Sequence, residues 1–502
     1  MSKQFVDEIK IAREATITMG GSLASGLLRY LFNILIARLL GVELLGLYAL
    51  GSNVTRLGAT VGKMGLDTGI FRFIARYRSL DLNDNIVATI RRGVKVALGS
   101  ALLMTAAVFL SATWISDQIF NAGDTILANL LRGFALAIPL MIEAQVLSAV
   151  SQGFKVLKYK VLALQVIPGF AISLIFVMLV FWAKPFLTLT IAFTGAHIIS
   201  LIAAVYYLIR LVPLTHGSGG EFPPDLVQYS LPLMMSTMLS MLLYMSDVFM
   251  LGALAGSYAT GLYQPALRTA TVLNMIIASF GGIFAPMVSD LHAKNNIGKV
   301  QELLCVVSRW SLAIVWPSTL FLIVYASQVM LLFGDEFLAS TSSLSILAGS
   351  QILIVITTGN GIIFGMTGHP RLNLINNFAA LVTNIIANAY LIPLHGLVGA
   401  AWGTLIAIVL LAVLRLVEAW VLFRLHPFSI SLIKPLIAGL VASAACALIN
   451  LTSFNWPPIS VLLAGMTIFS VIYLFVYYLL GVDQTDREVI QVIYHKLRRA
   501  NG

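Results

Sequence analysis

Long runs of apolar residues alternate with short polar junctions from one end of the chain to the other. About 20 residues are needed to cross the roughly 30 Å hydrocarbon core as a helix. With proline, glycine and charge clusters as boundaries, the runs predict fourteen transmembrane helices. Their ranges are 15–38, 46–70, 93–115, 126–149, 160–182, 186–210, 226–252, 258–288, 301–326, 342–366, 372–392, 397–423, 431–452 and 458–480. The runs are continuous, which favours helices over the alternating strands of a membrane barrel.

Composition supports the same fold class. Of the 502 residues, 59% are hydrophobic and 10% are charged, whereas soluble domains usually contain about 25% charged residues. We therefore expect an all-α integral membrane protein. Between the runs there is no stretch long enough for a nucleotide-binding or catalytic domain, so an enzyme is not expected. Acidic residues precede the first run and no small-residue cleavage pattern follows it, so we expect the first helix to be retained.

Lysine and arginine gather in alternate junctions. Such residues flank membrane spans mostly on the cytoplasmic side, which predicts a multi-pass protein of the plasma (inner) membrane with both termini cytoplasmic. Lys184 is the clear exception in an outer junction. The formal net charge of +10 follows from this topology and from anionic inner-leaflet lipid, so nucleic acid is not an expected partner. Beyond the last run, the tail "DREVIQVIYHKLRR" predicts an amphipathic helix on the inner membrane surface.

A motif occurs twice, 215 residues apart. "GVELLGLY" begins at Gly41 and "GSYATGLY" begins at Gly256, each at an outer junction after the first helix of a half. A second pair of segments, "GFKVLK" and "GHPRLN", has the same offset. Six helices per half is an even number, which predicts two parallel-related six-helix lobes about an axis along the membrane normal. The predicted organisation is 1–214 and 215–425 for the lobes, and 426–502 for the last two helices and the tail. Tyr48 and Tyr263 are expected to anchor the motif at the headgroups.

Several cationic residues fall inside the predicted spans. Burying a charge near the bilayer centre costs at least about 2.5 kcal/mol, so such residues are functional candidates. Arg56 follows Gly46 by ten residues, which places it about 15 Å into the membrane. Arg29, with Asn33 one turn later, and Arg268 lie inside other spans. We expect these residues, together with Lys63, to bind an anionic substrate, because arginine is suited to phosphate.

Three acidic residues also fall within spans: Asp67, Glu143 and Asp247. Each is a candidate for binding a coupling ion, H+ or Na+, and no other cofactor is expected. A structural reading remains open, in which Lys63 pairs with Asp67 and Arg268 pairs with Asp247.

At this point the chain resembles a known family. The segments "ARLLGVELLGLYAL", "GFKVLKYK" and "LIPLHGLVGAAWGTLIA" are similar to polysaccharide and oligosaccharide-lipid flippases of the multidrug/oligosaccharidyl-lipid/polysaccharide exporter superfamily. The resemblance covers essentially the whole chain. It implies two six-helix lobes that alternate access, followed by two additional helices. It also implies an undecaprenyl-pyrophosphate-type lipid-linked oligosaccharide as substrate, with its phosphates on Arg29, Arg56 and Arg268, which lie in the segments that contain arginines in related flippases.

Alternative functions remain open from the sequence. A cation-coupled multidrug exporter of the same superfamily is the main alternative, although fourteen spans and a cationic cleft speak against it. A membrane glycan polymerase or ligase is disfavoured because the outer junctions are short. The expected partners are the lipid-linked oligosaccharide and membrane lipids, with a glycan polymerase as a further candidate.

Overall fold

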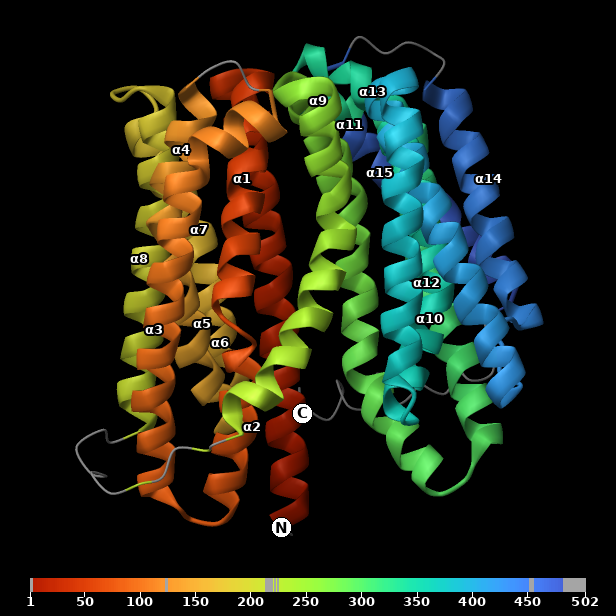
Figure 1. Cartoon of the computed structure of the whole chain (residues 1–502). Helices are drawn as coiled ribbons and strands as arrows, with labels where there is room; N and C mark the ends of the chain where they lie inside the picture. Colours follow the sequence, from red (N-terminus) through yellow and green to blue (C-terminus); the bar gives the residue numbers. More distant parts are fainter. Residues whose placement is uncertain are drawn as a thin grey trace, which may run out of the picture. The chain divides into compact units, whose positions relative to one another are not determined.

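The computed structural model describes residues 3–121, 125–212, 220, 223, 225–450 and 456–481, without the side chains of 3–16, 19 and 275–283. Within these ranges the regular structure is helical and contains no β-strand (Figure 1). The predicted tail helix lies outside the described residues. The all-α fold class is confirmed.

The long helices follow the apolar runs of the sequence. Shorter helices, including two π-helices and two 3₁₀ helices, connect or extend them. In chain order the elements are α1 (Lys3–Gly62), α2 (Leu66–Ser79), α3 (Asn83–Trp114), η1 (Ile115–Ile119), α4 (Thr125–Ala135), α5 (Ala137–Gly153), α6 (Leu157–Val161), η2 (Leu162–Val166), α7 (Ile167–Leu179), α8 (Pro185–Leu211), α9 (Leu226–Ala293), α10 (Ile297–Val324), α11 (Ala326–Leu331), η3 (Asp335–Ser340), α12 (Thr341–Met366), α13 (Pro370–Phe423), η4 (Ile430–Leu432), α14 (Ile433–Asn450) and α15 (Pro458–Leu479).

Three of these helices turn back at a single glycine. Gly41 in α1 and Gly256 in α9 both have φ of 86°, and Gly396 in α13 has φ of 56°. Glycine adopts positive φ without the steric cost that a Cβ brings. Within the described residues, eleven stretches are long and apolar enough to cross a membrane, and these three glycines each divide one of them. The result is fourteen helical segments, the predicted number.

The second predicted span ends earlier than expected. It was predicted to reach residue 70, but α1 ends at Gly62 and α2 begins at Leu66. Met64 and Gly65, with φ of 53° and 70°, are both left-handed, and such residues end an α-helix. Gly65 also packs closely, because a Cβ there would lie 2.3 Å from the carbonyl oxygen of Ser230. Asp67 is therefore on α2 and does not continue the helix of Arg56.

The chain divides into two compact units. The first comprises Met1–Arg268 and Leu374–Ala407, and the second comprises Thr269–Asn373 and Ile408–Gly502. The lobe boundaries expected from the repeat, at residues 214 and 425, stay predictions.

An aromatic cluster forms part of the core of the first unit. The ring of Tyr48 meets Phe32, Phe134 and Phe193 edge-on, at centroid separations of 5.5, 5.9 and 6.3 Å. Phe32 also packs edge-on against Phe176, at 5.4 Å. Edge-to-face pairs add about 0.5–1.5 kcal/mol each beyond their burial. Helices α1, α4, α7 and α8 therefore fix the position of Tyr48.

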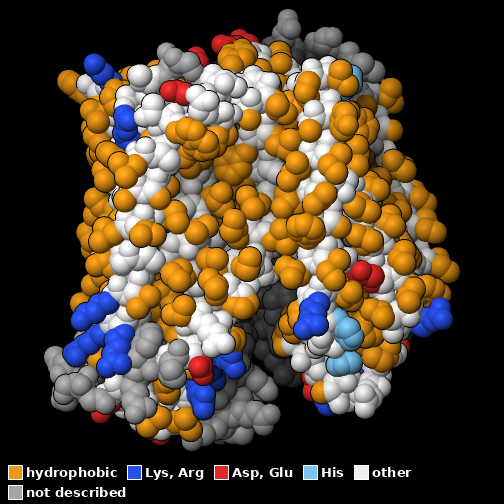
Figure 2. Space-filling view, in the orientation of Figure 1, with side chains coloured by type: hydrophobic (Ala, Val, Ile, Leu, Met, Phe, Trp, Pro, Cys, Tyr) orange, Lys and Arg blue, Asp and Glu red, His pale blue; other side chains and the backbone are white. Residues whose placement is uncertain are grey.

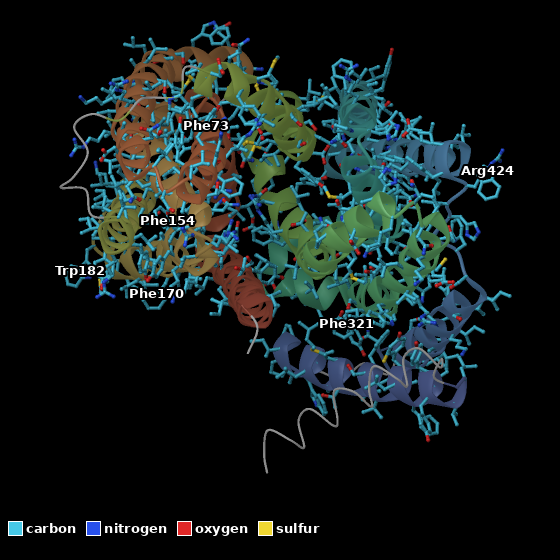
Figure 3. All side chains as sticks on the ribbon, turned by 90° about the horizontal axis from the view of Figure 1, so that it is seen from below. Phe73, Phe154, Phe170, Trp182, Phe321 and Arg424 are labelled. Carbon is cyan, nitrogen blue, oxygen red and sulfur yellow. The ribbon has the colours of Figure 1, made fainter. Side chains whose placement is uncertain are left out.

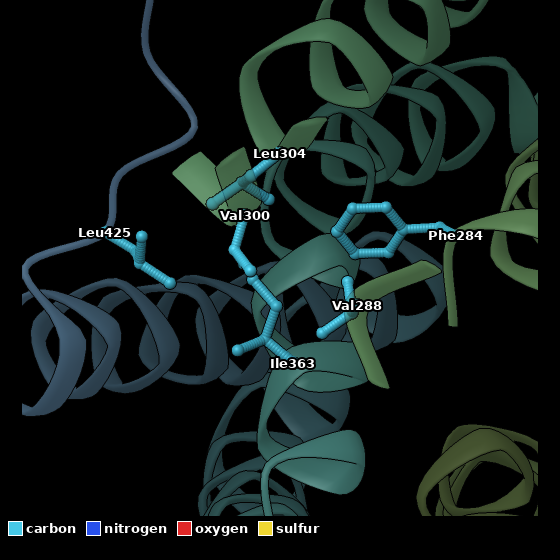
Figure 4. Close-up of a cluster of buried hydrophobic side chains, with 6 residues drawn as sticks. All are labelled: Phe284, Val288, Val300, Leu304, Ile363 and Leu425. Atoms are coloured by element: carbon cyan, nitrogen blue, oxygen red, sulfur yellow. The ribbon is translucent and has the colours of Figure 1, made fainter. Parts of the chain in front are cut away.

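Two clusters organise the second unit. Figure 4 shows the first, in which α9, α10, α12 and the segment after α13 bury Phe284, Val288, Val300, Leu304, Ile363 and Leu425. In the second cluster, α14 and α15 pack around Tyr325. Gly465 of α15 makes this contact close, since a Cβ there would lie 2.5 Å from the Tyr325 ring.

The outer faces of the helices are apolar. Figure 2 shows hydrophobic side chains over most of the visible surface, with Lys and Arg gathered toward the helix ends. Phe170 and Trp182, labelled in Figure 3, are 58% and 88% exposed on the outside of the first unit. Exposed apolar side chains in such numbers indicate contact with lipid. The structure thus agrees with a multi-pass membrane protein, while the side on which the termini lie stays a prediction.

Candidate functional site

The three arginines singled out from the sequence come together in the first unit. Arg29 lies before the Gly41 turn of α1, Arg56 lies after it, and Arg268 follows the Gly256 turn of α9. The charge of Arg56 interacts with that of Arg29, and the charge of Arg268 interacts with both. Residues separated by up to 239 positions therefore form one cationic cluster, which we call the arginine cluster.

Neutral side chains contact two members of the arginine cluster. Arg29 Nη2 donates to Ser25 Oγ at 2.6 Å. With the Gln264 amide turned to satisfy its neighbours, its oxygen accepts from Nη2 and Nε of Arg268, at 3.1 and 3.0 Å. Arg56 makes no side-chain hydrogen bond or ion pair with the described part of the chain.

Three like charges held together in a membrane repel one another. Water screens this repulsion poorly in a low-dielectric interior. A bound anion would offset it. The guanidinium group binds phosphate through two parallel N–H···O bonds, which makes phosphate the best-matched anion.

Tyr48 belongs to this site, although the sequence indicated a different role. It is 6% exposed, so the predicted position at the headgroups is wrong. Its phenol interacts electrostatically with Arg29, Arg56 and Arg268. Its hydroxyl is a hydrogen-bond donor beside the three cations. The repeated motif singled the residue out, but interfacial preference is a statistical tendency that the aromatic core overrides here.

Asn33 lies one turn after Arg29 and is also buried. Its Nδ2 donates to the carbonyl oxygen of Arg29 at 2.7 Å. Its Oδ1 is buried without a hydrogen-bond partner among the described residues. Buried polar atoms are rarely left in this state, so Asn33 offers an acceptor that a substrate hydroxyl or amide can satisfy.

Lys63 and Asp67 form the pair that the sequence allowed. Lys63 Nζ lies 2.9 Å from Asp67 Oδ2 and donates to Gln145 Oε1 at 2.8 Å. This contact confirms the pairing, even though a helix break separates the two residues. Whether Lys63 also binds substrate, or Asp67 an ion, stays a prediction.

Glu143 of α5 is a second unusual carboxyl group. It is 7% exposed, and neither carboxyl oxygen has a hydrogen-bond partner among the described residues. The described salt bridges do not include it. A charged carboxylate without any partner is strongly disfavoured in such a place.

Asp247 is the centre of a second polar cluster in the first unit. Its Oδ1 accepts from Nδ2 of Asn384 and of Asn388, both at 2.8 Å. Its Oδ2 accepts from the Tyr263 hydroxyl at 3.1 Å and from the Thr404 hydroxyl. All four of these donors are neutral, and the considered pairing of Asp247 with Arg268 stays a prediction.

This second cluster, which we call the Asp247 cluster, is rich in oxygen atoms. Asn384 Oδ1 accepts from Ser246 Oγ at 2.7 Å, while Asn388 Oδ1 is buried without a partner among the described residues. Carboxylate, amide and hydroxyl oxygens are the ligands that hard cations prefer. With an amide oxygen left unpartnered beside a carboxylate, the Asp247 cluster stays a candidate site for the coupling ion.

The sequence contained one signal for this cluster. Asn384 and Asn388 are four residues apart in an apolar run and therefore share a helix face. Their approach to Asp247, 137 and 141 residues earlier, is not visible in the sequence. Among the described residues no group of three or more His, Cys, Asp or Glu could hold a metal ion.

Comparisons with known proteins agree with this fold. The family described as "Polysaccharide biosynthesis protein" matches residues 11–292. The chain is 26% identical over 170 residues to the probable low-salt glycan biosynthesis flippase Agl15 of Haloferax volcanii, covering 34% of the chain and 36% of Agl15. It is 21% identical over 258 residues to the probable flippase AglR of the same organism, covering 49% of the chain and 52% of AglR. The chain thus spans about a third and about half of these relatives.

Solved structures show the same architecture. The lipid II flippase MurJ in an inward closed conformation matches with a TM-score of 0.70 and 15% identity, covering 95% of the chain and 100% of MurJ. An inward-facing MATE multidrug resistance transporter of the MOP superfamily matches with a TM-score of 0.65 and 15% identity, covering 82% of the chain and 98% of the transporter. With the family match over more than half of its length, the chain belongs to the polysaccharide biosynthesis protein family and has the fold of MurJ and the MATE transporters.

Proposed function

We propose that this protein is a flippase that moves a lipid-linked oligosaccharide of the undecaprenyl-pyrophosphate type from the inner to the outer leaflet. The observation on which the proposal rests is the arginine cluster, in which the charges of three guanidinium groups interact. A pyrophosphate carries the charge and the oxygen geometry that such a cluster requires. The family match and the flippase names of Agl15, AglR and MurJ support the same function.

In this proposal each residue of the site has a binding role. The phosphate oxygens bind to Arg29, Arg56 and Arg268. Their negative charge offsets the repulsion among the three guanidinium groups. The Tyr48 hydroxyl donates a further hydrogen bond, and Asn33 Oδ1 accepts one from the sugar nearest the pyrophosphate. The lipid tail stays in the membrane, and the two halves open alternately to each side. No bond is made or broken.

Movement against a gradient requires an energy source, and we propose a cation bound at the Asp247 cluster. Asp247 supplies the charge, and Asn384, Asn388 and Thr404 supply neutral oxygens, a set suited to Na+. Protonation of Asp247 is the alternative use of the same cluster. Glu143 and Asp67 stay as further candidates for the coupling ion.

The test is flipping of a fluorescent undecaprenyl-pyrophosphate oligosaccharide in proteoliposomes. We compare the wild type with Arg29→Ala, Arg56→Ala and Arg268→Ala at matched protein levels. Arg132→Ala is the control, because Arg132 lies in the same unit but contacts Thr113 and Asn129 at a helix end. Loss of flipping in the three variants and its retention in the control support the proposal.

A multidrug exporter is the second candidate, since the MATE transporters share the fold. The arginine cluster disfavours it, because cationic drugs would be repelled. If the wild type moves none of a panel of pyrophosphate lipids and exports a cationic dye, the exporter function replaces the flippase.

A further inference from the structure

The two copies of the repeated motif touch each other. A Cβ on Gly46 would lie 1.9 Å from the carbonyl oxygen of Ser257, and a Cβ on Gly261 would lie 1.9 Å from the carbonyl oxygen of Val42. The 215-residue offset relates these two contacts, since Gly46 corresponds to Gly261 and Val42 corresponds to Ser257. The contact is therefore reciprocal, and the same two positions are used from each side.

Only glycine permits this approach. A side chain would overlap a backbone carbonyl group, which cannot move aside as a flexible side chain can. Small residues at a helix crossing let two backbones come together inside a membrane, where Cα–H···O contacts add a little stability. We call this reciprocal contact of Gly46 and Gly261 the glycine contact.

The glycine contact lies between the Gly41 and Gly256 turns and the arginine cluster. Arg56 follows Gly46 by ten residues and Arg268 follows Gly261 by seven, which correspond to about 15 and 10 Å along a helix. In Figure 1, α1 begins at one end of the first unit and rises to the opposite end before it turns. The contact thus lies toward the end opposite to the start of α1.

We propose that the glycine contact is a seal that closes the arginine cluster from the end opposite to the start of α1, and that each transport cycle breaks and remakes it. This inference rests on the proposed function, because a seal has a purpose only where access alternates. A backbone contact suits a seal, since it excludes water directly. No side chain has to be ordered each time the contact forms again.

Tyr263 connects the seal with the Asp247 cluster. It lies two residues after Gly261, and its hydroxyl donates to Asp247. Gln264, which contacts Arg268, is the next residue. One turn of α9 therefore joins the seal, the proposed cation site and the arginine cluster, so a change at Asp247 can be transmitted directly to Gly261.

The other end of the same helices is held differently. Gly69 of α2 faces the Ser230 hydroxyl, which a Cβ would approach to 2.2 Å, and Arg72 stacks on the Tyr229 ring with its Cζ 4.0 Å from the ring centroid. A close backbone contact is present there too, since a Cβ on Gly65 would lie 2.3 Å from the carbonyl oxygen of Ser230. The glycine contact differs in being reciprocal, because Gly46 and Gly261 each approach a carbonyl oxygen of the other copy of the motif.

The experiment measures distances across the seal by double electron–electron resonance. Spin labels are placed at Glu43→Cys and Tyr258→Cys. Both native residues are exposed and occupy equivalent positions of the two motif copies. Glu43 follows Val42 and Tyr258 follows Ser257. Cys305 and Cys446, the two native cysteines, are replaced by Ala. We expect a short-distance population that gives way to a longer one when undecaprenyl-pyrophosphate oligosaccharide is added to proteoliposomes. An unchanged distribution would overturn the proposal without any substitution in the contact itself.

Glycine variants provide the second readout. Gly46→Ala and Gly261→Ala are expected to populate the longer distance without substrate and to slow flipping about ten-fold or more, the effect of overpacking a close contact. Gly99→Ala is the matched control, since a Cβ there meets nothing within 4 Å. Flipping and distances that match those of Gly99→Ala would contradict the seal.

Failure of the proposed function has a different signature. If the wild type moves no pyrophosphate lipid, the flippase proposal fails, whatever the glycine variants do. If the wild type flips lipid and Gly46→Ala does so equally well, only the seal is refuted.

Discussion

Arg56 shows what an unpaired side chain means at the scale of one residue. The two other arginines of the cluster have protein partners, Ser25 for Arg29 and Gln264 for Arg268. Arg56 has none in the described part of the chain, so its guanidinium group is fully available to a substrate. It is therefore the residue whose loss should affect binding most directly.

We expect Arg56→Ala to weaken pyrophosphate-lipid binding by about 10- to 100-fold, because hydrogen bonds to charged groups contribute about 1.5–3 kcal/mol. Arg56→Lys keeps the charge but loses the two-pronged geometry, so an intermediate loss is expected. Lipid binding in detergent, measured by microscale thermophoresis, checks both. Equal binding of Arg56→Ala and wild type would remove Arg56 from the site.

Asp247→Asn tests the second cluster. The change keeps the shape but removes the charge, and it places an amide among groups that donate to the carboxylate. We expect flipping to lose its stimulation by an imposed Na+ or H+ gradient, and the melting temperature to fall. Asp290→Asn, in an exposed pair with Lys294, is the control. Full gradient stimulation in Asp247→Asn would exclude this residue as the ion site.

The sequence identified the arginines and Asp247 as candidates, because charged residues are rare within apolar runs. It did not identify Asn384, Asn388 and Thr404 as partners of Asp247, because they are neutral and distant from it in the chain. Tyr48 was noticed for its place in the repeat, but its electrostatic interaction with the arginines depends on the fold of α1 and α9. The charge of a residue can be read from the sequence, whereas the residues that the fold brings next to it cannot.

At the scale of elements, three glycines give the molecule its helical hairpins. Hydropathy predicted all fourteen segments, because each must be long enough to cross the bilayer. It did not predict the early end of the second segment at Gly62, since the turn at Met64 and Gly65 is set by backbone conformation and by the close approach of Ser230.

We expect Gly256→Ala to destabilise the protein by about 1 kcal/mol or more, because an alanine at φ of 86° is strained even though a Cβ meets nothing within 4 Å. Gly349→Ala also enters open space, but its helical backbone suits alanine, so its stability should stay equal or rise. Thermal unfolding in detergent compares the two. A Gly256→Ala protein as stable as Gly349→Ala would show that the turn is not strained.

At the scale of the whole molecule, the even number of predicted segments leads to a prediction of topology. Fourteen crossings would return the chain to its starting side, and the positive residues predict that this side is the cytoplasm. Reporter fusions at residues 1 and 502 should both give the cytoplasmic signal, and a fusion at Lys184, between α7 and α8, should give the external one. Opposite signals at the two termini would mean that one segment does not cross.

The reciprocal glycine contact has a consequence for the history of the chain. Two surfaces that use the same positions from each side have the form of an isologous interface, as in a twofold-symmetric homodimer. In such a dimer a single substitution alters both sides of the contact at once. Joining the halves into one polypeptide removes this constraint, so that one copy of the motif can place Tyr48 beside three arginines while the other places Tyr263 on a carboxylate. The two copies of the motif thereby keep the same glycine contact while their tyrosines have different neighbours.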